Sequence, residues 1–171
     1  MHCAVSSTIR PLAAADPPVI AAAFAAIGWS KPREQYERYL VEQEAGERQV
    51  WVASVDDAFA GYVTLSRRPA YAPFREEGIP EIQDLNVLPA FRRRGVGSAL
   101  LDAAEAAAGA RVGIAVGLEA GYGAAQRLYV RRGYVPDGRG IAYRWRTVEY
   151  GEQIVVDDDL VLCFTREVGH R

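Results

Sequence analysis

The chain has 171 residues, of which 50% are hydrophobic and 25% charged, and its formal net charge at pH 7 is −2. This length corresponds to one domain, and the hydrophobic fraction can form a substantial core, which excludes an intrinsically disordered chain. The nearly neutral charge excludes a nucleic-acid-binding protein that works through broad electrostatic attraction. We therefore expect a single globular domain over residues 1–171 without a nucleic-acid partner.

The cysteines and histidines do not predict a metal site, and the first residues do not predict secretion. Cys3 and Cys163 lie far apart without metal-ligand spacing, and His2 and His170 are near the termini, so we expect reduced thiols and no metal. The first residues lack the basic and apolar segments of a secretory signal. The longest apolar stretch, Val19 to Ile27, is too short to cross a bilayer. The expectation is a cytoplasmic protein without a membrane partner.

The first half of the chain predicts strands and helices separated by clear turn signals. In chain order, we expect a strand over Val5–Leu12, a loop at Asp16–Pro18, a helix over Val19–Ile27, a helix from a Ser30 cap to about Ala45, and strands over Gln49–Val55 and Phe59–Ser66. Pro32 suits the first turn of the second helix, and Gly46 suits its end. Asp56-Asp57-Ala58 is short enough for a hairpin, whereas Arg67 to Pro80 carries three prolines and is expected as a loop.

The second half predicts alternating strands and helices. We expect strands over Glu81–Leu88, Arg111–Leu118, Ile141–Val148 and Asp159–Val168, helices over Arg94–Ala108 and Ala124–Arg132, and a turn over Tyr134–Gly140. Val96, Leu100 and Ala103 share one face of the first of these helices. This order of elements predicts an α/β (α+β) fold with a mixed sheet.

A glycine-containing turn joins the strand that ends at Pro89 to the next helix. It has the sequence Arg92-Arg93-Arg94-Gly95-Val96-Gly97-Ser98. Glycine lets the backbone approach a ligand closely, and the first amides of a helix have no partner within it, so the turn suits a phosphate group. Leu100 rules out the dinucleotide fingerprint, and the lack of a nearby lysine rules out a P-loop. On its own, the turn indicates either a phosphate site or a helix start with solvated arginines.

Two sequence patterns follow each other between Glu81 and Tyr134. Arg92, Gly95 and Gly97 fit Gln/Arg-x-x-Gly-x-Gly/Ala, and a second pattern, Asn-x-x-Ala-x-x-x-Tyr-x-x-x-Gly-Phe, is fitted by Ala125, Tyr129, Gly133 and Tyr134. With one strand between them, these patterns resemble the Gcn5-related N-acetyltransferase (GNAT) superfamily. The chain departs from the second pattern at Tyr122, where the family has an asparagine that helps to hold the pantetheine arm of coenzyme A.

The resemblance implies a fold and a co-substrate. The fold is a mixed, mostly antiparallel sheet of six to seven strands flanked by about four helices, splayed at the central parallel pair. The co-substrate is acetyl-CoA, whose pantetheine would pair with the backbone of Leu85 and Val87 like an added strand. Its pyrophosphate would bind the turn through Arg92, Arg93, Arg94, Gly95, Val96, Gly97 and Ser98, mainly by the backbone amides of residues 93 to 98, and Ala125 would also contact the coenzyme.

The resemblance also implies catalytic residues. Acetyl transfer requires a neutral amine, so a base must take its proton. Glu81 lies fourteen residues before Gly95, as does a catalytic glutamate in the histone-acetylating branch, and it is the first candidate. Asp84 is the second candidate, chosen not from the resemblance but because it alternates to the other face of the strand from Leu85 and could meet the substrate. Tyr129 would protonate the departing thiolate, with an ordinary tyrosine pKa of about 10. The alternatives are a solvated strand residue for Glu81 and a packing role for Tyr129.

The acceptor is less clearly indicated. Acidic and aromatic loop residues favour a cationic amine, but they also suit a solvated surface, the core or a homodimer contact; they are Glu76, Glu77, Glu149, Glu152, Asp157, Asp158, Asp159, Tyr71, Phe74, Tyr143, Trp145 and Tyr150. The sequence thus predicts an acetyl-CoA-dependent N-acetyltransferase that acts on a primary amine of a small molecule or protein by direct attack in a ternary complex. The alternatives are an acyltransferase with another donor or acceptor and a non-catalytic coenzyme-A-binding regulatory module.

Overall fold

The computed structural model describes residues 7–169. These residues contain five α-helices and eight strands, hydrogen-bonded in the order β1-β2-β3-β4-β5-β8-β6-β7. Neighbouring strands are antiparallel except β4 and β5, whose parallel ladder joins Glu81 to Gly113 and Ile82 to Ile114. The predicted mixed, mostly antiparallel sheet is confirmed, whereas its splay beyond this ladder stays a prediction.

Contacts along the chain define two compact units, which are described separately. Of the described residues, unit 1 comprises 7–66 and 83–107, and unit 2 comprises 67–82 and 108–169. The expectation of a single catalytic domain stays a prediction.

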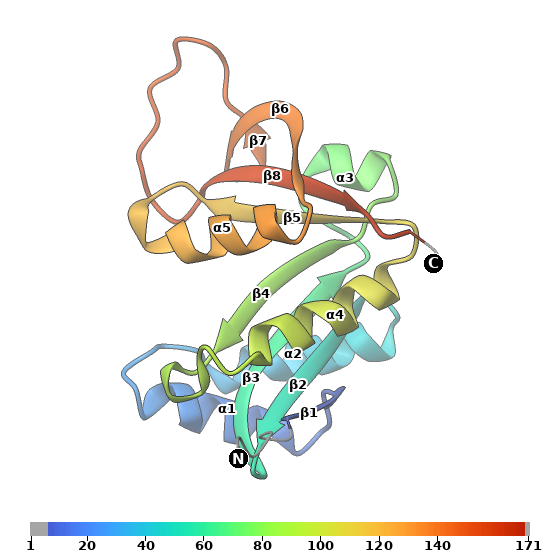
Figure 1. Cartoon of the computed structure of the whole chain (residues 1–171), viewed down its shortest axis with the longest axis vertical. Coiled ribbons are helices and arrows are strands. Elements are labelled where there is room, and N and C mark those ends of the chain that lie inside the picture. Colours follow the sequence, from blue (N-terminus) through green and yellow to red (C-terminus); the bar gives the residue numbers. More distant parts are fainter. Residues whose placement is uncertain (1–6, 170–171) are drawn as a thin grey trace. The chain divides into compact units, whose positions relative to one another are not determined.

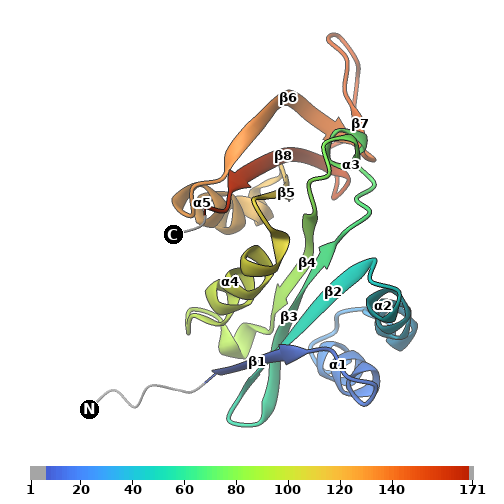
Figure 2. The ribbon, with the colours of Figure 1, turned by 90° about the vertical axis from the view of Figure 1, so that its right-hand side faces the viewer.

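Unit 1 is a layered α/β unit. Its elements are β1 (Ser7–Pro11), α1 (Asp16–Ala25), α2 (Arg33–Glu44), β2 (Arg48–Val55), β3 (Ala58–Ser66), the larger part of β4 (Glu81–Val87), the short helix η1 (Pro89–Phe91) and nearly all of α4 (Val96–Ala108). Helices α1 and α2 lie on one side of the strands and α4 lies on the other (Figures 1 and 2). The core under α1 and α2 is rich in aromatic residues and consists of Leu12, Ile20, Phe24, Tyr36, Tyr39, Val50, Val52, Tyr62 and Leu88.

Two predictions of helix starts in unit 1 are wrong. Helix α1 begins at Asp16, not after Pro18, because the prolines occupy its first turn and the Asp16 carboxylate accepts bonds from the Ala13 amide and the Arg10 guanidinium, each 2.7 Å long. Helix α2 begins at Arg33 after an extended Pro32, without the predicted Ser30 cap. The predicted hairpin is confirmed by the positive φ angles of Asp56 and Asp57, 49° and 62°, which suit a tight turn between β2 and β3.

Unit 2 contains α3 (Ala72–Glu76), the start of β4, β5 (Arg111–Gly117), the short helix η2 (Ala120–Tyr122), α5 (Gly123–Arg131), β6 (Val135–Tyr143), β7 (Arg146–Thr147) and β8 (Leu160–Glu167). Figure 2 shows α5 and α3 on opposite sides of β5 and β8. A core cluster of this unit consists of Tyr71, Phe74, Ile79, Ala142, Val161 and Cys163.

Two segments of unit 2 differ from the prediction. The segment Arg67–Pro80 is not entirely a loop, because α3 forms within it and buries Phe74. The segment Tyr134–Gly140 is not a turn, because β6 begins at Val135; the turn lies instead at Arg144 and Trp145, which both have positive φ and connect β6 to β7. The sheet therefore has eight strands where six to seven were expected.

Cys163 is buried as a free thiol, whereas Cys3, His2 and His170 lie outside the described residues. Over residues 7–169, none of the helices combines the length and the hydrophobicity needed to cross a bilayer. In the same range, no three His, Cys, Asp or Glu side chains gather in a way that could hold a metal ion.

Candidate functional site

The backbone of β4 is irregular at Asp84. This residue has a φ of 54°, which is uncommon for a residue other than glycine and marks a local break in the extended strand. Gly61 on β3 faces the break, since a β-carbon added there would lie 2.4 Å from the carbonyl oxygen of Asn86. The close approach of β3 and β4 at this point therefore requires a glycine at position 61.

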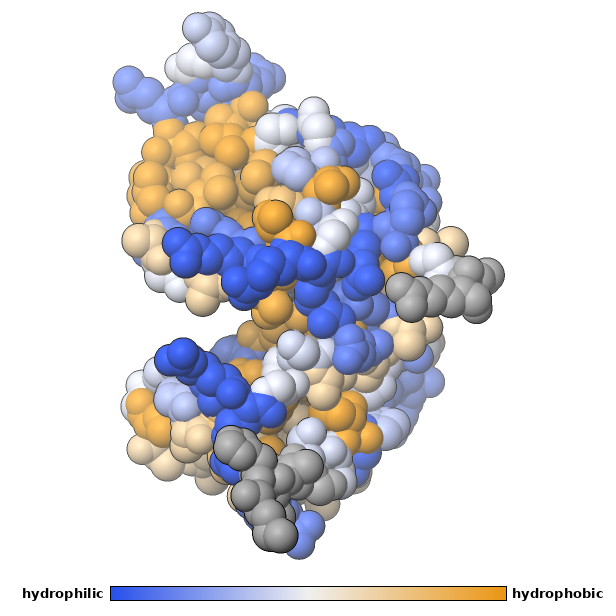
Figure 3. Space-filling model, in the orientation of Figure 1, coloured by the Kyte–Doolittle hydropathy of each residue, from blue (hydrophilic) through white to orange (hydrophobic). Residues whose placement is uncertain are grey.

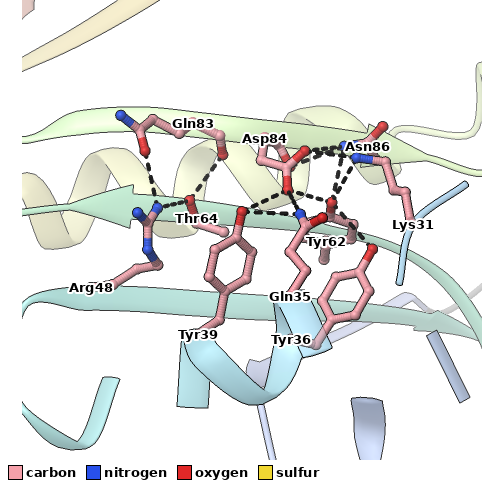
Figure 4. A network of polar contacts seen from close by, with 10 residues as sticks. All are labelled: Lys31, Gln35, Tyr36, Tyr39, Arg48, Tyr62, Thr64, Gln83, Asp84 and Asn86. Carbon is pink, nitrogen blue, oxygen red and sulfur yellow. Dashed lines mark hydrogen bonds and ion pairs between the residues drawn. The ribbon is translucent and has the colours of Figure 1, made fainter. Parts of the chain in front are cut away.

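The Asp84 carboxylate is the centre of a polar cluster (Figure 4). Its Oδ1 accepts hydrogen bonds from Lys31 Nζ at 2.9 Å and Asn86 Nδ2 at 2.8 Å. Its Oδ2 accepts bonds from Gln35 Nε2 at 2.8 Å, Tyr39 Oη at 2.9 Å and Tyr62 Oη at 2.5 Å. These donors come from α2, the loop before it, β3 and β4. We call Lys31, Gln35, Tyr39, Tyr62, Asp84 and Asn86 the Asp84 cluster.

The cluster shifts the pKa values of its carboxyl group and its phenols. Burial alone would raise the pKa of Asp84, but the Lys31 charge and the hydrogen bonds from Tyr62, Lys31 and Tyr39 outweigh it and hold this pKa below its usual value. Burial and the Asp84 charge raise the pKa values of Tyr62 and Tyr39, and burial raises the pKa of Tyr36 to about 12. At neutral pH, a charged carboxylate thus faces neutral phenols, an arrangement that binds cations. To accept a proton, Asp84 would first have to lose one of its donors.

The glycine-containing turn lies at the end of β4 in the same unit. Arg93 and Gly95 have positive φ angles of 60° and 80°, and α4 begins at Val96 rather than at the predicted Arg94. The Ala99 amide donates to the Gly95 carbonyl at 3.0 Å, so the amides of residues 96–98 precede the helical ladder, as at any helix start. Arg92, Arg93 and Arg94 are exposed. This geometry is compatible with the predicted phosphate site, which stays a prediction.

Arg92 connects the turn to the loop between α1 and α2. Its Nε donates to the Val87 carbonyl at 3.2 Å, and its guanidinium carbon lies 5.6 Å from the centre of the Trp29 ring. Trp29 is two residues before Lys31. One short loop therefore contacts both the glycine-containing turn and the Asp84 cluster.

Three of the predicted site residues lie in unit 2. Glu81 is 0% exposed and pairs with Gly113 across the parallel ladder. Ala125 and Tyr129 lie on α5. Tyr129 is 6% exposed, and burial raises its pKa to about 12, so its hydroxyl remains protonated at neutral pH. The roles proposed for Glu81, Ala125 and Tyr129 stay predictions.

Tyr122, which stands where the family has asparagine, is held within unit 2. Its hydroxyl donates to Asp158 at 2.9 Å, and its ring lies over Gly117, where an added β-carbon would come within 2.3 Å of it. A nearby amide, Gln126 Nε2, donates to the Gly117 carbonyl at 2.8 Å. Tyr122 thus links η2 to the loop before β8.

The acidic and aromatic loop residues mostly have internal partners. Tyr71 and Phe74 belong to the core, Glu77 pairs with Arg111 and Arg139, and Glu152 pairs with Arg146. Exposed hydrophobic residues remain, including Tyr150, Val155 and Val156. Figure 3 shows a hydrophobic surface below the hydrophilic tip of the loop between β7 and β8. These contacts support a structural interpretation of most of the loop acids.

The structure thus brings Asp84, Leu85, Val87 and residues 92–98 together within unit 1. The donors around Asp84 were missed from sequence, because a regular strand pattern does not indicate that Asp84 adopts a left-handed conformation. One feature of the sequence could have drawn attention to Lys31 as a donor: it is the only lysine in the chain.

The fold has many relatives of known structure. A GNAT-family acetyltransferase from Desulfovibrio desulfuricans is 20% identical, with a TM-score of 0.71 over 96% of this chain and 100% of that chain. A GNAT-family acetyltransferase from Elizabethkingia anophelis, crystallised with acetyl-CoA bound, is 20% identical, with a TM-score of 0.61 over 94% and 97% of the two chains. An acetyltransferase from Salmonella typhimurium that modifies the N-terminal serine of ribosomal protein L7/L12 is 13% identical, with a TM-score of 0.69 over 95% of both chains.

A search of curated proteins found no match. The family model described as "Acetyltransferase (GNAT) family" matches residues 16–134, which include β4, the glycine-containing turn and α5. The chain therefore belongs to the GNAT acetyltransferase family.

Proposed function

We propose that this protein is an acetyl-CoA-dependent N-acetyltransferase that transfers an acetyl group to a primary amine of a small molecule or protein. The observation that carries this proposal is the Asp84 cluster, a carboxylate that already holds an ammonium group at 2.9 Å. It lies on the same strand as Leu85 and Val87, the residues predicted to pair with pantetheine. An amine site and a coenzyme site would thus share β4.

Coenzyme A would bind unit 1 through its phosphates and its pantetheine arm. Backbone amides at the start of α4 suit the pyrophosphate, because the helix end carries partial positive charge. Arg92 to Arg94 strengthen this field. Acetyl-CoA in the E. anophelis relative supports the same co-substrate here.

The chemistry follows from the predicted roles. A base, Glu81 or Asp84, removes a proton from the bound ammonium, and the neutral amine attacks the thioester carbon directly in a ternary complex. A backbone N–H near Leu85 or Val87 stabilises the oxyanion. The carbon–sulfur bond breaks, and Tyr129 donates a proton to the thiolate of coenzyme A. The second proton of the amine nitrogen then restores the Tyr129 hydroxyl, which leaves the neutral amide. The high pKa of Tyr129 keeps its proton available across the physiological range.

The acceptor class is proposed from charge. A site built around a carboxylate, phenols and aromatic rings favours a cationic amine over a neutral or anionic one. The Salmonella relative modifies a protein N-terminus, so peptide α-amines belong among the candidates together with alkyl amines. We further propose that the reaction takes place in the cytoplasm.

A panel of amines tests this proposal. Purified protein and acetyl-CoA are mixed with each amine, or with an alcohol for comparison, and the release of free thiol is measured together with the mass of the acetylated product. We expect at least one cationic amine to be acetylated. Binding of acetyl-CoA without transfer to any amine would favour the regulatory module, and transfer to alcohols alone would favour another acceptor class.

A further inference from the structure

Lys31 is an amine of the protein itself that occupies the cation position of the Asp84 cluster. Its Nζ lies 2.9 Å from Asp84 Oδ1 and 3.1 Å from Tyr62 Oη. It also lies 5.7 Å from the centres of the Phe24 and Tyr62 rings. Since Lys31 is the only lysine in the sequence, its side chain is the one ε-amine that the chain can offer as an acetyl acceptor.

The position of Lys31 also relates it to the predicted coenzyme site. Asp84, its partner, directly precedes Leu85 on β4, and Trp29 on the same loop contacts Arg92 of the glycine-containing turn. The Lys31 side chain is 20% exposed, so it is not sealed within the core. An amine with a carboxylate at hydrogen-bond distance has the geometry that proton removal requires.

We propose that Lys31 is a self-acetylation site, at which the protein transfers an acetyl group from its own bound acetyl-CoA to Lys31 Nζ. This inference rests on the proposed function, because it uses the same donor and the same strand. It adds to the proposed function that Lys31 occupies the amine site beside Asp84 when no external acceptor is bound.

The reaction is balanced without a further reactant. The Lys31 ammonium loses one proton to solvent, and its nitrogen attacks the thioester carbon. The new carbon–nitrogen bond forms, the carbon–sulfur bond breaks, and the second nitrogen proton passes to the departing thiolate. The products are an Nε-acetyl-lysine at position 31 and free coenzyme A.

Acetylation would change the cluster. It removes the charge of Lys31 and therefore its ion pair with Asp84 and its contacts with the Phe24 and Tyr62 rings. The carboxylate keeps its neutral donors Gln35, Tyr39, Tyr62 and Asn86, but it lacks a cation. An external ammonium would then be the natural replacement, so modification of Lys31 would open the site for other amines.

Intact-protein mass spectrometry with peptide mapping tests the inference on the full chain. The protein is incubated with acetyl-CoA near pH 8, and acetylation of Lys31 is compared with that of the chain's α-amine. Chemical acetylation favours the α-amine, whose pKa of about 8 is well below the lysine value of about 10.4. We expect the opposite order, with Lys31 modified at least about tenfold faster, because the folded protein orients it.

Two controls sharpen the result. Lys31→Arg keeps the cation but removes the acceptor, so one acetyl group fewer should be incorporated. A first-order rate constant for Lys31 acetylation that does not change on dilution of the protein, at saturating acetyl-CoA, indicates transfer within one chain. A first-order rate constant that rises in proportion to protein concentration would overturn that part of the inference.

Failure of this inference can be separated from failure of the proposed function by assaying the amine panel on the same samples. Unmodified Lys31 in a protein that acetylates external amines would overturn the inference and leave the proposed function standing. Unmodified Lys31 in a protein that neither binds acetyl-CoA nor acetylates any amine would overturn both.

Discussion

The Tyr62 hydroxyl donates a hydrogen bond of 2.5 Å to Asp84 Oδ2, and this bond joins the site to the core of unit 1. The Tyr62 ring is fully buried and meets the rings of Tyr36 and Phe24 edge to face, with centroids 5.3 and 5.9 Å away. Asp84 is therefore held by side chains that cannot move without disturbing the core. Such preorganisation is expected where an amine must be oriented.

Asp84→Asn should destabilise the protein. The substitution leaves the Lys31 charge without its partner and replaces a carboxylate that accepts bonds from Tyr39 and Tyr62, so we expect a loss of about 2–3 kcal/mol in the free energy of unfolding at pH 7. Chemical denaturation measures this loss. Glu44→Gln, which removes an exposed carboxylate at the end of α2, serves as the control and should change stability by less than about 0.5 kcal/mol.

The difference in stability between the wild type and Asp84→Asn should depend on pH. The pKa of Asp84 is lower in the folded protein than in the unfolded chain. Ionised Asp84 therefore contributes its full share to the free energy of unfolding above the pKa of the unfolded state, about 3.9, and this share declines as the pH falls through the pKa of the folded state. The difference in stability between wild type and Asp84→Asn should therefore narrow below about pH 4. A difference that widens on acidification would contradict the assigned charge state.

Gly95→Ala should weaken acetyl-CoA binding. Gly95 has a φ of 80°, so an alanine there is strained by about 1–2 kcal/mol in the left-handed region and shifts the turn that is predicted to bind pyrophosphate. Calorimetric titration should show at least about a tenfold rise in Kd. The matched comparison is Gly97→Ala, because the family pattern accepts alanine at this position and a β-carbon there meets only Val87 Cγ2, at 3.7 Å. Its Kd should rise less than that of Gly95→Ala. An unchanged Kd for Gly95→Ala would argue against the turn as the pyrophosphate site.

Tyr129→Phe should slow turnover without unfolding the protein. Phenylalanine keeps the ring packing against Tyr134, whose centroid lies 5.8 Å away, but it removes the hydroxyl proposed to protonate the thiolate. We expect kcat to fall by about 100-fold, the lower range for a general acid, with little change in melting temperature. Tyr134→Phe, which matches the family pattern, should retain activity. If Tyr129→Phe turns over normally, Tyr129 has only a packing role.

Glu81→Gln distinguishes the two candidate bases. If Glu81 takes the proton, kcat near pH 7 should fall by about 100-fold and recover partly at alkaline pH, where the amine loses its proton to solvent. A steady-state pH profile of acetyl transfer measures both effects. Unchanged turnover would assign the base to Asp84 or to solvent.

The sequence predicted the parts of the fold that depend on local signals. The pattern of Arg111 to Leu118 identified β5, and Gly46 and Gly109 identified helix ends, because such features depend on neighbouring residues only. Other features depend on contacts distant in sequence. The left-handed Asp84 is compatible with β4 only because Gly61 on β3 leaves room for Asn86, and no pattern within either strand indicates this.

The candidate site also has a part that local sequence predicts and a part that depends on contacts distant in sequence. Residues 92–98 could be predicted as a candidate phosphate site from sequence, because a helix start and its glycines are contiguous. The donors around Asp84 come from α2, β3 and the loop at Lys31, and only the tertiary structure brings them together.

Titration of the purified protein with acetyl-CoA, followed by calorimetry and by the shift in melting temperature, tests the central claim most directly. We predict saturable binding of one acetyl-CoA per chain at micromolar concentration, a higher melting temperature, and weaker binding by Gly95→Ala than by Gly97→Ala. The absence of both heat and thermal shift at millimolar acetyl-CoA would contradict the claim that this protein uses the coenzyme.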